Sequence, residues 1–113
     1  MSTQLACVYM FGFSLRQTRH LESLIPIMAA QRAQGTKIGV VLLHDAVIGT
    51  TRPDSMPQSL KDLLALPTTV FVLAPDLEAR GLDAGVLPDE IRPLQYDDLV
   101  DLLAEVSKVH SWA

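Results

Sequence analysis

The chain has 113 residues, 49% of them hydrophobic, and this length fits a single domain over residues 1–113 with a substantial buried core. Its formal net charge is −4 and its lysine and arginine residues are scattered, which disfavours direct binding to the phosphate backbone of a nucleic acid. No apolar run approaches the ~20 residues that cross a membrane, and one cysteine excludes an internal disulfide, so we expect a cytoplasmic location.

The first two predicted elements are a strand at residues 5–10 and the helix that follows it. Ser14 and Gln17 have the spacing of a capping box, in which each side chain bonds a backbone N–H at the start of a helix. Gly35 predicts the end of this helix, because glycine readily adopts the left-handed conformation that terminates one. Pro26 lies inside the helix and removes one backbone hydrogen bond, so we expect a kink or a break there.

Two further predicted strands, at residues 37–43 and 68–73, are apolar on nearly every residue. Strands of this kind are buried on both faces, as in the middle of a parallel sheet. A short helix at residues 59–66 separates them, and a short strand is predicted at 91–94. The alternation of strands and helices indicates right-handed crossovers in an α/β fold, a three-layer α/β/α sandwich around a mostly parallel sheet of four to five strands.

The last predicted helix spans residues 96–110. Its apolar residues recur at helical spacing and form one expected buried stripe: Leu99, Leu102, Leu103, Val106 and Val109. Lys108 and His110 lie near its end, where positive charge interacts favourably with the helix dipole. Trp112 follows the helix, and an apolar ring there needs a surface to bury against, so it is a candidate partner contact.

Polar residues follow the second and third of these strands. His44 and Asp45 come directly after one strand, and Asp76 and Arg80 come after the other. Open α/β folds place their sites at the carboxyl ends of parallel strands. These four residues are therefore candidates for contact with a ligand or a partner.

Each of these four residues also has a structural interpretation. Asp45 would cap the turn after its strand, and His44 would pack at a subunit contact. Asp76 would cap a short helical turn by accepting a bond from an N–H two or three residues later, and Gly81 would end that turn. Arg80 would pair with Asp76 at helical spacing, whereas its functional alternative is to bind an anion or a partner's carboxylate. The sequence leaves these alternatives open.

Cys7 is the candidate catalytic residue, because it is the one thiol of the chain. Its place in the first predicted strand favours burial, which raises the pKa of a thiol and lowers its reactivity. The three histidines, His20, His44 and His110, lie on separate elements without cysteine or carboxylate at ligand spacing, so no metal site is expected. Neither glycine-rich nucleotide-binding motif is present, so we expect no cofactor.

Four stretches of the sequence carry motifs of one known family. Residues 70–82 contain a strand that runs into Asp-Leu-x-Ala-Arg-Gly, and residues 42–47 contain leucines before Asp-Ala-Val, with Ala46 where glycine is usual. Residues 92–100 combine a short strand with the start of the last helix, and residues 111–113 end the chain as Ser-Trp-Ala. In their order and spacing, these stretches resemble the DsrH/TusB family.

The resemblance implies a DsrE/F/H-like fold and a role in sulfur relay. In this family the subunit assembles with E/D-type and F/C-type partners into a complex that passes persulfide sulfur between carrier proteins. The sulfur is destined for tRNA wobble-uridine thiolation or for sulfur oxidation. The resemblance therefore implies that the candidate residues contact partner subunits or, if the chain self-assembles, copies of itself.

One position departs from the pattern of the sulfur-oxidising members. They carry a cysteine after Leu-Glu-Ser in the first helix, whereas Leu24 follows that tripeptide here, as in the tRNA pathway subunits, which also lack the cysteine. This implies a scaffold subunit without catalysis of its own. The alternatives are a self-assembling thiol protein that carries sulfur on Cys7, and a small-molecule binding domain.

Overall fold

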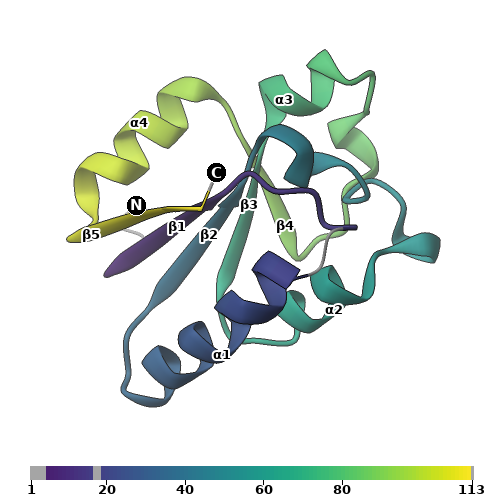
Figure 1. Ribbon diagram of the computed structural model, residues 1–113. Helices are drawn as coiled ribbons and strands as arrows, with labels where there is room; N and C mark the ends of the chain where they lie inside the picture. The colour runs from purple at the N-terminus through teal and green to yellow at the C-terminus, as the bar shows by residue number, and fades with distance from the viewer. Residues whose placement is uncertain (1–4, 17–18, 113) are drawn as a thin grey trace.

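The computed structural model describes residues 5–16 and 19–112, which form one five-stranded sheet with helices on both faces (Figure 1). The strands are β1 (Cys7–Phe11), β2 (Ile38–Leu42), β3 (Thr69–Leu73), β4 (Ile91–Leu94) and β5 (Lys108–Trp112). The helices are α1 (Arg19–Ala33), α2 (Gln58–Leu64), α3 (Ala74–Ala79) and α4 (Tyr96–Glu105), with the 3₁₀ turns η1 (His44–Val47), η2 (Pro53–Ser55) and η3 (Ala84–Val86). The strand order is β4-β3-β2-β1-β5 and every pair is parallel, which confirms the predicted α/β class.

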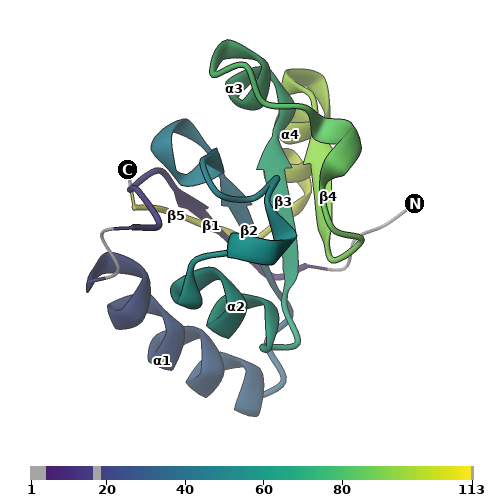
Figure 2. The same cartoon turned by 90° about the vertical axis from the view of Figure 1, so that its right-hand side faces the viewer.

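The sheet is buried on both faces. All of β2 and four of the five residues of β3 are buried, as their continuous apolar runs predict. Helices α1 and α2 lie side by side over one face (Figure 2), where Phe11, Val40 and Leu60 belong to the larger core cluster. Helix α4 covers the other face, where Val41 and Leu102 belong to the smaller cluster. The predicted three-layer sandwich is therefore confirmed.

Helix α1 differs from its prediction at the start and in the middle. It begins at Arg19, and the predicted capping box includes Gln17, which lies outside the described residues. The Ser14 hydroxyl instead accepts a hydrogen bond from the Arg16 N–H at 3.2 Å. The helix runs through Pro26 as one element, so the predicted break is wrong. Pro26 lies on the exposed face, where water can bond the carbonyl that its missing N–H leaves without a partner.

The C-terminal segment is the main correction to the predicted fold. Helix α4 ends at Glu105, and Val106 has extended backbone angles that lead into β5. Lys108, Val109 and His110 are therefore strand residues, all exposed, rather than the last turn of a helix. Without β5, strand β1 would leave one row of backbone groups unpaired, and β5 satisfies them in the register that pairs Cys7 with Lys108.

Gly35 and Gly81 have φ values of 87° and 68°, which confirms that each ends its helix in the left-handed conformation. Among the described residues, no helix combines the length and the apolar character required to cross a membrane.

Candidate functional site

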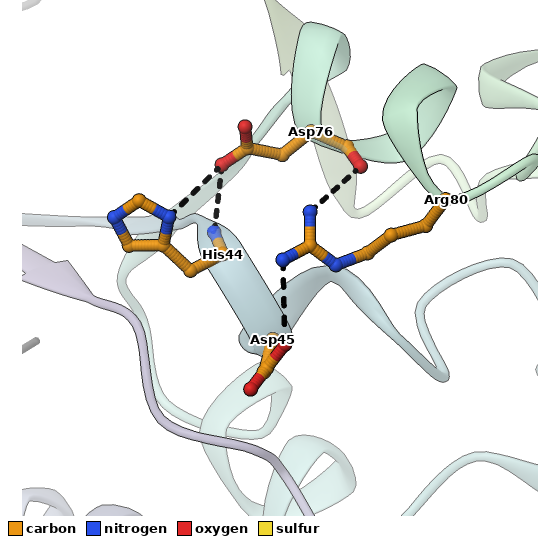
Figure 3. A network of polar contacts seen from close by, with 4 residues as sticks. All are labelled: His44, Asp45, Asp76 and Arg80. Atoms are coloured by element: carbon orange, nitrogen blue, oxygen red, sulfur yellow. Dashed lines mark hydrogen bonds and ion pairs between the residues drawn. The ribbon is translucent and has the colours of Figure 1, made fainter.

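The four polar residues that follow β2 and β3 form one connected network (Figure 3). The His44 backbone N–H donates to the Asp76 carboxylate at 2.7 Å. The Arg80 guanidinium donates through Nη2 to the Asp45 carboxylate and through Nη1 to the Asp76 backbone carbonyl, both at 3.3 Å. We call these four residues the strand-edge cluster. It joins loops from neighbouring strands, because parallel strands bring their carboxyl ends to the same edge of the sheet.

His44 has an unusual backbone conformation within the strand-edge cluster. Its φ is 51°, the one positive value at a non-glycine residue in the part of the chain that the structure describes. This left-handed conformation costs about 1–2 kcal/mol for a residue with a Cβ, and such strain concentrates at functional sites. The hydrogen bond to Asp76 holds it in place, because the carboxylate is a charged acceptor and only 13% exposed.

The imidazole of His44 points towards solvent. Its side chain is 66% exposed, and Nδ1 lies 3.9 Å from the Asp76 carboxylate (Figure 3). The ring is thus presented at the surface with a carboxylate behind it, an arrangement that orients an imidazole for contact with another molecule.

Three of the structural interpretations from the sequence are wrong: the cap by Asp76, the cap by Asp45 and the ion pair of Arg80 with Asp76. Asp76 does not cap the helix after β3, because α3 begins at Ala74 with Leu73 as its N-cap and no side-chain cap. Asp45 does not cap η1, since the N-cap there is Leu43, and its carboxylate pairs with Arg80 instead. Arg80 therefore pairs with the carboxylate of Asp45, in the loop that follows β2. Its bond to Asp76 goes to the main-chain carbonyl and not to the carboxylate.

The ion pair between Arg80 and Asp45 lies at the surface. The Asp45 side chain is 64% exposed, so the pair is worth at most about 1 kcal/mol. A carboxylate or another anion from a partner can replace Asp45 at little cost. The guanidinium of Arg80 is held in place by its second bond, to the Asp76 carbonyl.

Cys7 is buried, whereas the side chains of the strand-edge cluster reach the surface. It is 2% exposed and lies in β1, between strands β2 and β5, which confirms the predicted burial. Burial raises the pKa of the Cys7 thiol, and this effect outweighs the opposing hydrogen bond with Tyr9 and the charge of Lys108. The reactive thiolate is therefore disfavoured in the folded chain.

Trp112 and the histidines occupy separate places. Trp112 ends β5 opposite Phe11, is partly buried against the core, and accepts a hydrogen bond from the Gly12 N–H through its carbonyl at 2.9 Å. The His20 ring stacks on Phe13, and the His110 ring stacks on Tyr9. Across residues 5–16 and 19–112, no three histidine, cysteine, aspartate or glutamate side chains group as metal ligands.

Comparisons with known proteins agree with this architecture. The family model described as "DsrH like protein" matches residues 14–109. "Protein TusB" of Salmonella dublin is 29% identical over 93 residues, which cover 82% of this chain and 94% of that protein. "Protein TusB" of Yersinia pestis (strain Pestoides F) is 31% identical over 86 residues, which cover 76% of this chain and 86% of that protein.

Two solved structures share the fold. The crystal structure of the ychN protein from E. coli matches with a TM-score of 0.75 at 19% identity and covers 95% of this chain and 98% of that one. The structure of MTH1491 from Methanobacterium thermoautotrophicum, a protein of unknown function, matches with a TM-score of 0.64 at 14% identity and covers 88% and 87%. At these identities the likeness establishes the fold alone.

Proposed function

Because the chain belongs to the family of DsrH-like proteins, we propose that it is a non-catalytic subunit of a sulfur-relay complex acting in tRNA thiolation. The observation that carries this proposal is the burial of the chain's one thiol. A sulfur carrier needs an accessible thiolate, and Cys7 is enclosed and has a raised pKa. Leu24, at the place of the cysteine in sulfur-oxidising relatives, is also fully buried and carries no sulfur.

The strand-edge cluster is the surface that we assign to the partner subunits. A persulfide on a partner's cysteine is an anion, and the Arg80 guanidinium and the exposed His44 ring offer it donors. This chain would then hold the partner's sulfur in position and form no covalent bond to it. We assign Trp112 to a second partner contact. It lies on β5, which β1 separates from β2 and β3, the strands that lead into the cluster.

Mixing the chain with candidate E/D-type and F/C-type subunits is expected to give one complex that co-elutes in size-exclusion chromatography. His44→Ala and Arg80→Ala should each weaken this association about tenfold, because each removes a charged or polar contact at the proposed interface. Arg92→Ala on β4 is the matched control, since Arg92 is exposed and lies outside the cluster. Failure to co-elute with every such partner would exclude the scaffold role, and self-association of the chain alone would point to copies of itself.

The competing function, sulfur carriage on Cys7, predicts a different chemical behaviour. Incubation of the folded chain with a persulfide donor is expected to leave its intact mass unchanged, because the thiol is buried. After unfolding in urea, Cys7 should react at least about a hundredfold faster, since opening of the fold limits reaction of a buried group. Intact mass spectrometry of native and unfolded protein measures both.

The control for this experiment is Cys7→Ser, which removes the one thiol of the chain. A mass gain of one sulfur in the native protein that disappears in this variant would make the chain a sulfur carrier. That result would overturn the scaffold role without bearing on the family assignment.

A further inference from the structure

A second feature lies at the carboxyl edge of the sheet and is separate from the contacts of the strand-edge cluster. It is a hollow of ≈ 450 Å³ between the loops that follow β1, β2 and α3. Arg16 comes from the first loop, Thr51, Arg52 and Ser55 come from the second, and Leu82 comes from the third. A volume of this size is typical of small-molecule sites, and the edge is where open α/β folds bind ligands.

The two arginines give the hollow its charge. In the described ranges of the chain, the guanidinium groups of Arg16 and Arg52 take part in no ion pair. Asp54 shares an adjoining hollow of ≈ 390 Å³ with Thr51, Arg52 and Ser55, but it lies beyond ion-pair distance of Arg52. Two like charges line one space without a compensating carboxylate, which favours the binding of an anion there.

The loop that forms one wall is held in a defined shape. Thr50 is fully buried, and its hydroxyl donates to the Val47 carbonyl at 2.7 Å. Gly49 has a φ of 95°, and a Cβ there would lie 3.2 Å from the Pro57 ring. The loop therefore turns tightly at glycine and packs on Pro57, so that Arg52 projects from a preformed wall, which reduces the entropy lost on binding.

We propose that this hollow binds a small molecule that carries a phosphoryl or sulfuryl oxyanion, held by Arg16 and Arg52. The forked guanidinium bonds two oxygens of a tetrahedral anion at once, and the Thr51 and Ser55 hydroxyls add neutral donors. Ile48 and Leu82 provide apolar surface for the remainder of the molecule. The proposal is independent of the sulfur-relay function, because no residue of the strand-edge cluster lines the hollow.

Thermal unfolding of the full chain tests this proposal with three probes: inorganic phosphate, thiosulfate and ribose 5-phosphate. Each probe is titrated at constant ionic strength against potassium chloride. We expect a saturable rise in Tm with at least one of them, because a ligand that binds only the folded state stabilises it. A response to the phosphates alone identifies a phosphorylated ligand, and a response to thiosulfate alone identifies a sulfur oxyanion. A response to all three means that the hollow recognises the tetrahedral oxyanion group that the probes have in common.

Substitutions locate the binding. Arg16→Ala and Arg52→Ala should each weaken the apparent affinity about tenfold, and Arg52→Lys should weaken it less, because lysine keeps the charge but loses the fork. Arg92→Ala, outside the hollow, should leave the affinity unchanged. No saturable rise with any probe, a rise that chloride reproduces, or an equal loss in Arg92→Ala would overturn the proposal.

Discussion

Leu102→Ala is expected to lower the free energy of unfolding by about 3 kcal/mol, the typical cost of a buried leucine truncation. Leu102 is 5% exposed and is the one buried side chain of α4 within the described chain. It packs with Val8, Val41 and Phe71 on the sheet face that α4 covers by itself. Because a domain of this size has a total stability of about 5–15 kcal/mol, the loss is a large fraction. Urea unfolding followed by circular dichroism measures it.

The control for this prediction lies on the same helix. Val100 is 65% exposed, so Val100→Ala should change the free energy of unfolding by less than about 0.5 kcal/mol. Equal losses in the two variants would mean that α4 does not pack through Leu102. A loss below about 1 kcal/mol for Leu102→Ala would mean that the cavity collapses and that this face of the sheet tolerates rearrangement.

The sequence predicts the sheet well, because its signal is local. The strands at residues 37–43 and 68–73 are apolar at nearly every position, and that pattern has few explanations other than burial on both faces. The structure has strands at Ile38–Leu42 and Thr69–Leu73, whose limits differ from the predicted ones by at most one residue. The short strand Ile91–Leu94 agrees with its prediction.

The fifth strand is missed because its cause is not local. Leu99, Leu102 and Val106 continue a helical spacing, and Val109 extends it, so the sequence favours a longer helix. The segment becomes a strand because β1 offers a free edge 101 residues earlier in the chain, where Cys7 pairs with Lys108. A pattern of apolar residues cannot report a pairing partner at that separation.

The sequence predicts that the four residues of the strand-edge cluster lie at one edge of the sheet, but it does not predict how they bond to one another. The topology places residues 44–45 and 76–80 at one sheet edge, yet Asp76 resembles a local cap by its position after a strand. Pro75 lies in the first turn of α3, so the helix starts before Asp76 and leaves its carboxylate for the neighbouring loop. Arg16 and Arg52 are brought together by folding alone and form no motif that the sequence reveals.

Asp76→Ala is expected to lower the free energy of unfolding by about 2 kcal/mol and to weaken association with partner subunits. The carboxylate accepts the His44 N–H at 2.7 Å, and hydrogen bonds to charged groups contribute about 1.5–3 kcal/mol. Removal of the carboxylate leaves the strained, left-handed backbone of His44 without the hydrogen bond that offsets its strain. Chemical denaturation measures the stability, and size-exclusion chromatography with the E/D-type and F/C-type subunits measures the association.

His44→Gly separates the structural effect of this bond from the proposed role of the imidazole. Glycine adopts a φ of 51° without the strain of a Cβ, so this variant should be more stable by about 1 kcal/mol. It keeps the backbone N–H that Asp76 accepts but loses the ring. We therefore expect it to be more stable yet to bind the partner subunits about tenfold more weakly. Unchanged association in His44→Gly, with loss in Asp76→Ala, would mean that the strand-edge cluster supports the loops and that the imidazole makes no contact with a partner.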